Sequence, residues 1–214
     1  HSDLRRQRQM CIRDRGKTWQ PVAAPLIHKI ERWWSENSLT FLCDLKGAIE
    51  GIDAPESAKD LLHVAFCRTL IKLSNAAFNH QSMSFKEGND ELDLVIDRKA
   101  IFQDDMAHVL GGCIEEVHAQ AEVKLHDARS LTEDVLGKFD LVITSPPYAN
   151  RMSYIRELRP YMYWLGYLKE AREAGELDWQ AIGGTWGVAT SRLNDWQASE
   201  DYQNDHLSEA VRSI

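Results

Sequence analysis

Apolar residues recur at helical spacing through the first half of the chain. In the clearest stretch they follow one another at intervals of four, four and three residues, which places their side chains on one face of a helix. We expect a helix of about 25 residues there, with Asp53 as its N-cap and Glu56 as the capping partner three residues on. The apolar positions of this stretch are Leu62, Phe66, Leu70 and Leu73.

The same spacing predicts four further helices. One begins at Pro25, a residue suited to a first helical turn, and carries Trp33 and Trp34. Another is rich in aromatic residues and contains Pro160. The remaining helical patterns cover residues 38–49 and 98–118, and the aromatic one covers residues 154–168.

The pattern changes near residue 121. Residues 122–126 alternate as a short strand and end at Asp127, and the apolar run 139–144 is typical of a second strand. A short helix at residues 131–136 separates them. Strand, helix and strand in this order predict a βαβ unit with parallel strands. We therefore expect an α/β fold in which a helical region, residues 22–120, precedes an α/β region, residues 121–214.

Composition and charge limit the class of protein. The hydrophobic content of 43% and the seven tryptophans suffice for a packed core. No apolar run approaches the roughly 20 residues that span a bilayer, and no signal peptide is visible. Residues 1–15 hold five of the 25 basic and two of the 33 acidic residues, so the formal net charge without them is −11. Such acidity argues against a nucleic-acid footprint over the whole surface, but allows a local basic face.

The first residues do not resemble a selected protein sequence. The string around Met10-Cys11-Ile12-Arg13-Asp14 resembles the translation of a sequencing adapter. We expect residues 1–15 to be adapter-derived and the chain, which opens on His1, to be a fragment; the alternative is a basic arm that binds nucleic acid. Three cysteines lie outside that segment, without Cys-x-x-Cys spacing, so we expect reduced, buried thiols in a cytoplasmic protein and no metal site. They are Cys43, Cys67 and Cys113.

The run Ser145-Pro146-Pro147-Tyr148 follows the second predicted strand directly. Proline lacks a backbone N–H and fixes φ, so the pair predicts a rigid exit from the strand. Such an exit presents carbonyl oxygens and the Ser145 hydroxyl to a planar amino group, on whose ring Tyr148 can stack. The alternative is a strand followed by a rigid turn with a packed tyrosine.

This run resembles motif IV of the amino-directed DNA methyltransferases, and its Ser-Pro-Pro-Tyr form is most similar to the cytosine-N4 branch. His126-Asp127-Ala128 resembles motif III of the same enzymes. The resemblance implies a partial Rossmann-like sheet that follows a large helical insertion, and S-adenosylmethionine as the cofactor. It assigns Asp127 to the adenine amino group of the cofactor, the Ala128 N–H to a ring nitrogen, and Thr144 to the same cofactor site.

The resemblance also implies how the reaction proceeds. The amine on cytosine or adenine is a poor nucleophile because its lone pair is delocalised into the ring. Acceptors at Ser145 and the Pro146 carbonyl would hold both amino hydrogens and free that lone pair for in-line attack. Pro147 stiffens the loop, and Tyr148 would stack on a base taken out of the duplex. A C5-cytosine enzyme would need a Pro-Cys pair, which the sequence lacks.

The residues after motif IV are candidates for contact with double-stranded DNA. Asn150 and Tyr154 resemble the downstream segment of a bacterial DNA modification methylase family, while Arg151 and Arg156 are either phosphate contacts or solvated helix charges. A cognate restriction endonuclease is a candidate partner, whereas the sequence does not define the oligomeric state. The Phe-x-Gly-x-Gly cofactor loop of the family is absent, so we expect the chain alone to bind the cofactor poorly and to be inactive.

Two other functions remain open. An RNA guanine-N2 methyltransferase has a related motif that usually begins with Asp or Asn, against which Ser145 counts. A helical interaction protein would use the α/β unit as a scaffold only and would ignore S-adenosylmethionine.

Overall fold

The computed structural model describes 130 of the 214 residues, and helix accounts for 62% of those described. The chain forms two units, which we describe separately: one holds His1–Ser145 and Pro160–Tyr167, and the other holds Pro146–Arg159 and Leu168–Ile214. The predicted boundary at residue 120 stays a prediction. The described residues are 19–77, 84–85, 90–114, 121–127, 137–144, 154–181 and 195.

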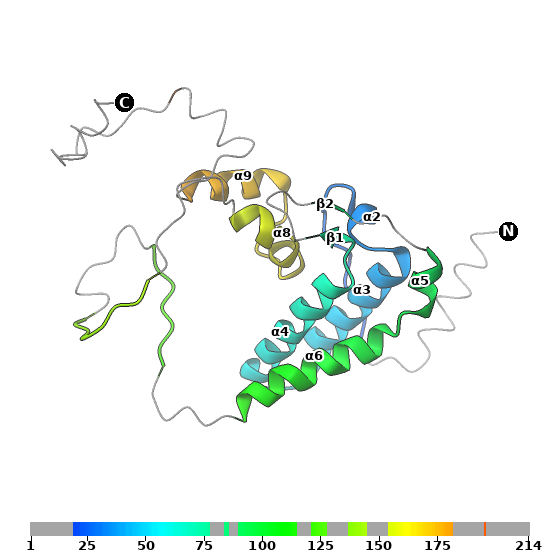
Figure 1. The fold of residues 1–214 in the computed structure, drawn as a ribbon, viewed down its shortest axis with the longest axis horizontal. Coiled ribbons are helices and arrows are strands. Elements are labelled where there is room, and N and C mark those ends of the chain that lie inside the picture. The colour runs from blue at the N-terminus through cyan, green and yellow to red at the C-terminus, as the bar shows by residue number, and fades with distance from the viewer. Residues whose placement is uncertain are drawn as a thin grey trace. The chain divides into compact units, whose positions relative to one another are not determined.

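The first unit is built on a row of three long helices (Figure 1). The central one, α4, packs against α3 and against α6. Two short helices and a minimal antiparallel pairing of β1 with β2 complete the elements described in this unit, apart from the end of α8. The bounds are α2 Ile30–Trp33, α3 Glu36–Gly51, α4 Glu56–Lys72, β1 Ala76–Ala77, β2 Ser84–Phe85, α5 Asp90–Val95 and α6 Arg98–Cys113.

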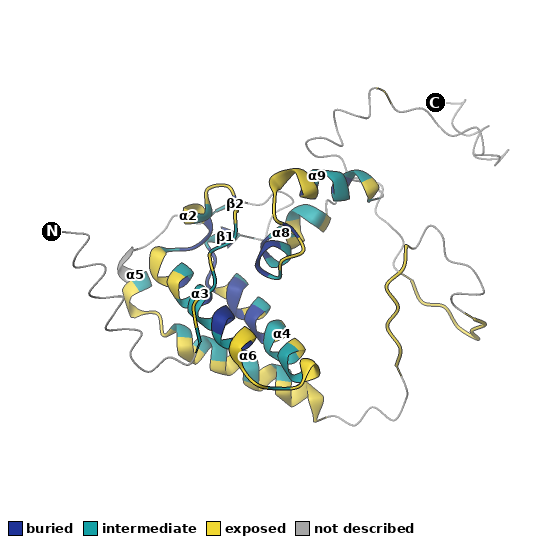
Figure 2. Cartoon of the chain, turned by 180° about the vertical axis from the view of Figure 1, so that it is seen from behind, coloured by how far each residue is buried: buried dark blue, intermediate teal, exposed yellow. Residues whose placement is uncertain are grey.

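Buried apolar residues lie where these helices meet. Leu42 of α3 and Phe66 and Leu70 of α4 are fully buried, as the predicted helical face requires. Figure 2 shows the buried positions gathered on α3, α4 and the end of α8, whereas α6 is largely exposed. The spacing of apolar residues thus predicted α3, α4 and α6 correctly, although α4 is shorter than expected and ends at Lys72.

An aromatic cluster closes one end of the core. Trp34 stacks on Trp33 with ring centroids 5.7 Å apart, and Trp164 meets Trp34 edge-on at 5.8 Å. Phe66 completes the cluster 5.6 Å from Trp164. The indole N–H of Trp34 donates to the Leu70 carbonyl at 2.9 Å, so the largest buried side chain also satisfies its polar atom.

Side-chain caps stabilise the starts of α3 and α6. Ser35 accepts the Ser38 N–H at the start of α3, and Asp97 accepts the Ala100 N–H at the start of α6. The predicted cap at Asp53 is wrong, because α4 begins after Pro55 and has no side-chain cap. The first predicted helix is also mostly wrong: the chain is irregular up to Lys29, whose φ of 52° is left-handed, and only α2 is helical.

A segment ahead of α2 crosses α3 at two glycines. The Val22 N–H donates to the Cys43 carbonyl at 3.2 Å. A Cβ built on Gly47 would lie 2.1 Å from the backbone oxygen of Gln20, and one on Gly51 would lie 3.2 Å from Trp19. Only glycine at position 47 allows the two backbones to approach this closely.

The aromatic-rich pattern correctly predicted a helix, α8, which covers Tyr154–Trp164. This helix begins in the second unit and ends in the first. Gly166 ends it with φ 80°, and two hydrogen bonds complete a glycine C-cap: Tyr167 N–H to the Met162 carbonyl and Gly166 N–H to the Tyr163 carbonyl. Helix α9, Ala171–Gln180, was not predicted, and it starts with a capping box formed by Glu170 and Glu173.

The predicted α/β fold is wrong for the part of the chain that the structure describes. Residues 122–126 and 139–144, expected as parallel strands of a Rossmann-like sheet, lie in the described segments 121–127 and 137–144, which are irregular; the described β structure is limited to β1 and β2. A strand is stabilised by pairing and by burial of one face. Every residue of both segments is exposed, so neither source of stability is present for them.

Candidate functional site

The residues predicted to carry catalysis lie outside the described part of the chain. This holds for the whole motif, Ser145, Pro146, Pro147 and Tyr148, and also for Ala128, Asn150 and Arg151. Four predicted site residues are described. Asp127 and Thr144 end two exposed irregular segments of the first unit, and Tyr154 and Arg156 share the first turn of α8 in the second unit.

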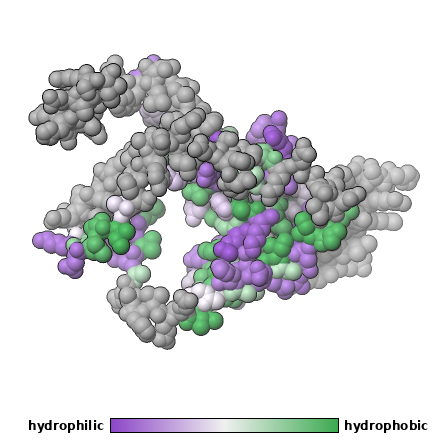
Figure 3. Space-filling view, viewed as in Figure 1, coloured by the Kyte–Doolittle hydropathy of each residue, from purple (hydrophilic) through white to green (hydrophobic). Residues whose placement is uncertain are grey.

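The two segments that lead to the predicted site are solvent-exposed and carry several apolar side chains. Val123 is 97% exposed, and Leu141, Val142 and Ile143 are exposed as well. Figure 3 shows the resulting concentration of apolar residues at the left of the view. Close to Asp127, the His126 ring Nδ1 lies 3.1 Å from the Asp127 carbonyl oxygen.

Asp127 and Thr144 are the described residues that the resemblance assigns to S-adenosylmethionine. Both residues are exposed. Neither of them lines the groove along α4 or the groove beside α3 and α5. An adenosine ring needs a pocket that covers most of its surface. The exposure of Asp127 and Thr144 therefore does not match an enclosed adenosine site.

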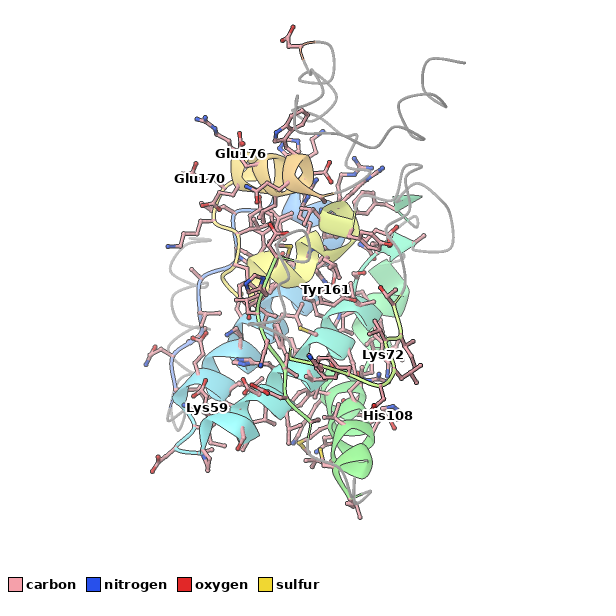
Figure 4. The ribbon with its side chains drawn as sticks, turned by 90° about the vertical axis from the view of Figure 1, so that its left-hand side faces the viewer. Lys59, Lys72, His108, Tyr161, Glu170 and Glu176 are labelled. Atoms are coloured by element: carbon pink, nitrogen blue, oxygen red, sulfur yellow. The ribbon has the colours of Figure 1, made fainter. Side chains whose placement is uncertain are left out.

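The larger groove, the α4 groove, lies in the first unit and has two walls. Helix α4 supplies one wall, and residues 161–167 supply the other; Tyr161 is labelled on α8 in Figure 4. The groove is open to solvent and has a volume of about 480 Å³. Its lining consists of Asp60, His63, Val64, Cys67, Arg68, Tyr161, Leu165 and Tyr167.

A buried lysine, Lys46, lies next to the imidazole ring of His63. Lys46 Nζ donates to Glu50 Oε1 at 2.6 Å and lies 3.3 Å from His63 Nε2. Burial lowers the pKa of His63, and the positive charge of Lys46 lowers it further, while nearby carboxylates such as Asp60 oppose the change. His63 is therefore neutral at neutral pH.

At the Arg68 end of the groove, the fully buried carboxylate of Asp105 binds two basic side chains. Asp105 of α6 accepts hydrogen bonds from Lys72 Nζ at 2.7 Å, Thr69 Oγ1 at 2.9 Å and Arg68 Nε at 3.1 Å. Burial alone would raise the pKa of Asp105, but these hydrogen bonds outweigh it and hold the pKa below its usual value. Asp105 thus ties α6 to α4 and fixes the position of Arg68.

A smaller groove of about 320 Å³ lies beside α3 and α5. Asp93 accepts hydrogen bonds there from Ser35 Oγ at 2.6 Å and Asn37 Nδ2 at 2.9 Å, and it forms an ion pair with Arg98. Arg98 also donates to Ser38 Oγ at 3.0 Å. These mutual contacts join α3, α5 and the start of α6, so the cluster explains packing and indicates no ligand.

The described residues do not supply a metal centre or an activated thiol. They contain no group of three or more His, Cys, Asp or Glu side chains that could hold a metal ion. Burial raises the pKa values of Cys43 and Cys67 to about 11, so both thiols stay protonated and unreactive. Cys113 is exposed, so the prediction that it is buried was wrong. Among the described helices, none is long and apolar enough to cross a membrane.

Comparison with known proteins identified no relative. No protein family, no curated protein and no solved structure matches the chain.

The α4 groove was not predicted from the sequence, although a signal for it exists. Asp60, Val64, Cys67 and Arg68 recur at intervals of four, three and one, which places them on one face of the predicted helix. A face that mixes charged and apolar residues suits a lined groove better than a packed core.

Proposed function

We propose that the chain carries the base-binding part of an S-adenosylmethionine-dependent DNA methyltransferase that acts on exocyclic amino groups, on cytosine N4 in preference to adenine N6. The observation that supports this proposal is the run Ser145-Pro146-Pro147-Tyr148 directly after the apolar segment 139–144. Asp127, at the end of the preceding apolar segment, adds the second motif in the expected order.

The chemistry at the base follows from the residue types. Ser145 Oγ and the Pro146 carbonyl each accept one hydrogen of the amino group, which draws the nitrogen lone pair out of conjugation with the ring. The prolines keep both acceptors fixed before the base arrives, so little reorganisation is needed. Tyr148 stacks on the extruded base and replaces part of the stacking lost from the duplex.

The test measures methyl transfer by the purified protein that contains residues 121–156. Tritiated S-adenosylmethionine is supplied with duplex DNA or with structured RNA, and the labelled nucleosides are identified after digestion. We expect label in N4-methylcytosine from DNA. Label only in N2-methylguanosine from RNA would instead identify the RNA guanine enzyme.

Two serine variants test the role of the motif. Ser145→Ala removes one fixed polar group, and we expect transfer to fall about 100-fold. Ser57→Ala, at an exposed position in the first turn of α4, is the matched control and should retain parental transfer. Undiminished transfer by Ser145→Ala would remove that residue from the reaction.

The helical content of the described residues favours a second candidate, a helical interaction protein. Such a protein would transfer no label to any nucleic acid and would bind no S-adenosylmethionine. As a methyltransferase the protein would act in the cytoplasm on chromosomal DNA, and a restriction endonuclease of the same sequence specificity is the partner to look for.

A further inference from the structure

The α4 groove has an acidic and a basic end on one helix. Asp60 and Arg68 are eight residues apart in α4, which corresponds to about 12 Å along the helix axis. Val64 and Cys67 lie between them in sequence and give this wall an apolar centre. All lining residues belong to the first unit, so the groove is a feature of that unit alone.

The basic end carries a guanidinium that is held in position. Arg68 uses Nε to bind the buried carboxylate of Asp105 at 3.1 Å, while 41% of its side chain stays exposed. The two terminal nitrogens belong to the same rigid plane, so fixing Nε also fixes their direction. A planar, pre-oriented guanidinium suits a carboxylate or phosphate group, which it can bind through two parallel hydrogen bonds.

His63 adds a hydrogen-bond donor without adding charge. The Lys46 ammonium, 3.3 Å from His63 Nε2, can only donate, so Nε2 is the acceptor. In the neutral ring the hydrogen then resides on Nδ1. His63 lines the groove, so a ligand oxygen that reaches Nδ1 can accept this hydrogen.

The opposite wall is aromatic and apolar. Tyr161 is half-buried, Leu165 lies beside it, and Tyr167 is 73% exposed although it is a large ring. Aromatic side chains at a groove suit a flat ring, which they contact edge-on or in an offset stack. On the α4 wall, the exposed side chain of Val64 adds further apolar surface.

We propose that this groove binds a small planar aromatic molecule that carries a carboxylate or phosphate. The ring contacts Tyr161 and Tyr167, and the anionic group binds Arg68. Asp60 repels such a ligand little, because a separation of about 12 Å exceeds the screening length of about 8 Å at physiological salt. This proposal is independent of the methyltransferase proposal.

Binding is tested on the full chain by isotope-edited NMR with four probes. Benzoate and phenyl phosphate carry the two candidate anions, benzamide is the neutral analogue of benzoate, and cyclohexanecarboxylate lacks the aromatic ring. We expect benzoate or phenyl phosphate to bind with a Kd of about 1 mM or tighter, and the stronger of the two defines the anion. The largest shifts should fall on residues 60–68 and 161–167.

Two variants locate the ligand. Tyr167→Ala removes an exposed ring and should weaken binding about tenfold, while Phe139→Ala, at a residue 66% exposed outside the groove, should leave Kd unchanged. Arg68→Lys keeps the charge beside Asp105 but loses the planar fork, and should also weaken binding about tenfold. Circular dichroism verifies that each variant remains folded.

Three results would overturn the proposal. They are absence of shifts at 10 mM benzoate and phenyl phosphate, on the order of ten times the expected Kd; equal affinity for benzamide; and an unchanged Kd in both Tyr167→Ala and Arg68→Lys.

Discussion

Helices α3, α4 and α6 and the segments 121–127 and 137–144 contain similar proportions of apolar residues but use them differently. Leu42 in α3 is fully buried, whereas Leu141 is 74% exposed. A helix satisfies its own backbone hydrogen bonds and needs a neighbour only for one face. An extended segment needs a partner for both its backbone and its side chains. An apolar strand pattern therefore specifies a need for a partner and does not supply one.

The largest expected effect concerns the carboxylate that joins two of the helices. Asp105→Ala removes the charge-assisted hydrogen bonds from Arg68 and Lys72 and leaves the buried Thr69 hydroxyl without its acceptor, and we expect a loss of about 3–5 kcal/mol of unfolding free energy. Urea denaturation followed by circular dichroism measures it. Asp104→Ala, at the neighbouring exposed position, is the control and should change stability by less than about 0.5 kcal/mol. Equal effects of the two variants would refute the structural role of Asp105.

The same substitution in the two regions separates them directly. Leu42→Ala creates a cavity among α3 and its neighbours and should cost about 2–5 kcal/mol. Leu141→Ala removes a side chain that is already exposed and should cost less than about 0.5 kcal/mol. A loss above 2 kcal/mol at Leu141 would mean that residues 137–144 are packed in the folded protein.

A smaller effect is expected where the chain ahead of α2 crosses α3. Gly47→Ala places a methyl group against the Gln20 backbone oxygen, and the required shift should cost about 1–3 kcal/mol. Gly112→Ala, in α6 with nothing within 4 Å, should instead stabilise the protein by up to about 1 kcal/mol. If the segment ahead of α2 lies on α3, the two variants should shift the Tm in opposite directions.

The smallest effect is a dependence of stability on pH through His63. Because burial and Lys46 lower the pKa of His63 in the folded protein, the unfolded chain takes up the proton more readily. The stabilisation is therefore present above a pH of about 6.5 and is lost as the pH falls through the lowered pKa. The carboxylates Asp93 and Asp105, whose pKa values are also lowered, act only below a pH of about 4.

His63→Gln tests this assignment. The urea midpoint of the variant should change less between pH 7 and pH 5 than that of the parent chain. An identical pH profile in the two proteins would show that His63 does not contribute to the dependence.

Most of the helical fold was predictable, and the reasons for the failures are specific. The spacing of Leu62, Phe66 and Leu70 predicted α4 because a helix needs only local hydrogen bonds and one apolar face. Helix α9 was missed because its sequence is mainly polar and presents few apolar residues. The strand at 139–144 was predicted wrongly because an apolar run with high β-propensity describes a surface that packs in a sheet, whose partners a single segment cannot reveal.

The two candidate sites also differ in how far the sequence alone can reveal them. The sequence predicts roles for Ser145 and Asp127 through local motifs, whose chemistry can be inferred without any tertiary structure. The groove with His63, Arg68 and Tyr161 depends on α4 meeting residues nearly 100 positions later, and on Lys46 and Asp105 behind it. Such long-range juxtapositions leave little trace in one sequence.

Hydrogen exchange tests the contrast between the two regions most directly. We expect peptides from 121–127 and 137–144 to exchange at nearly the rate of an unstructured chain, and peptides from α4 to be protected by a factor of at least about 1,000. Protection of residues 139–144 equal to that of α4 would contradict the account, because it would require hydrogen-bonded partners for a segment described as exposed and unpaired.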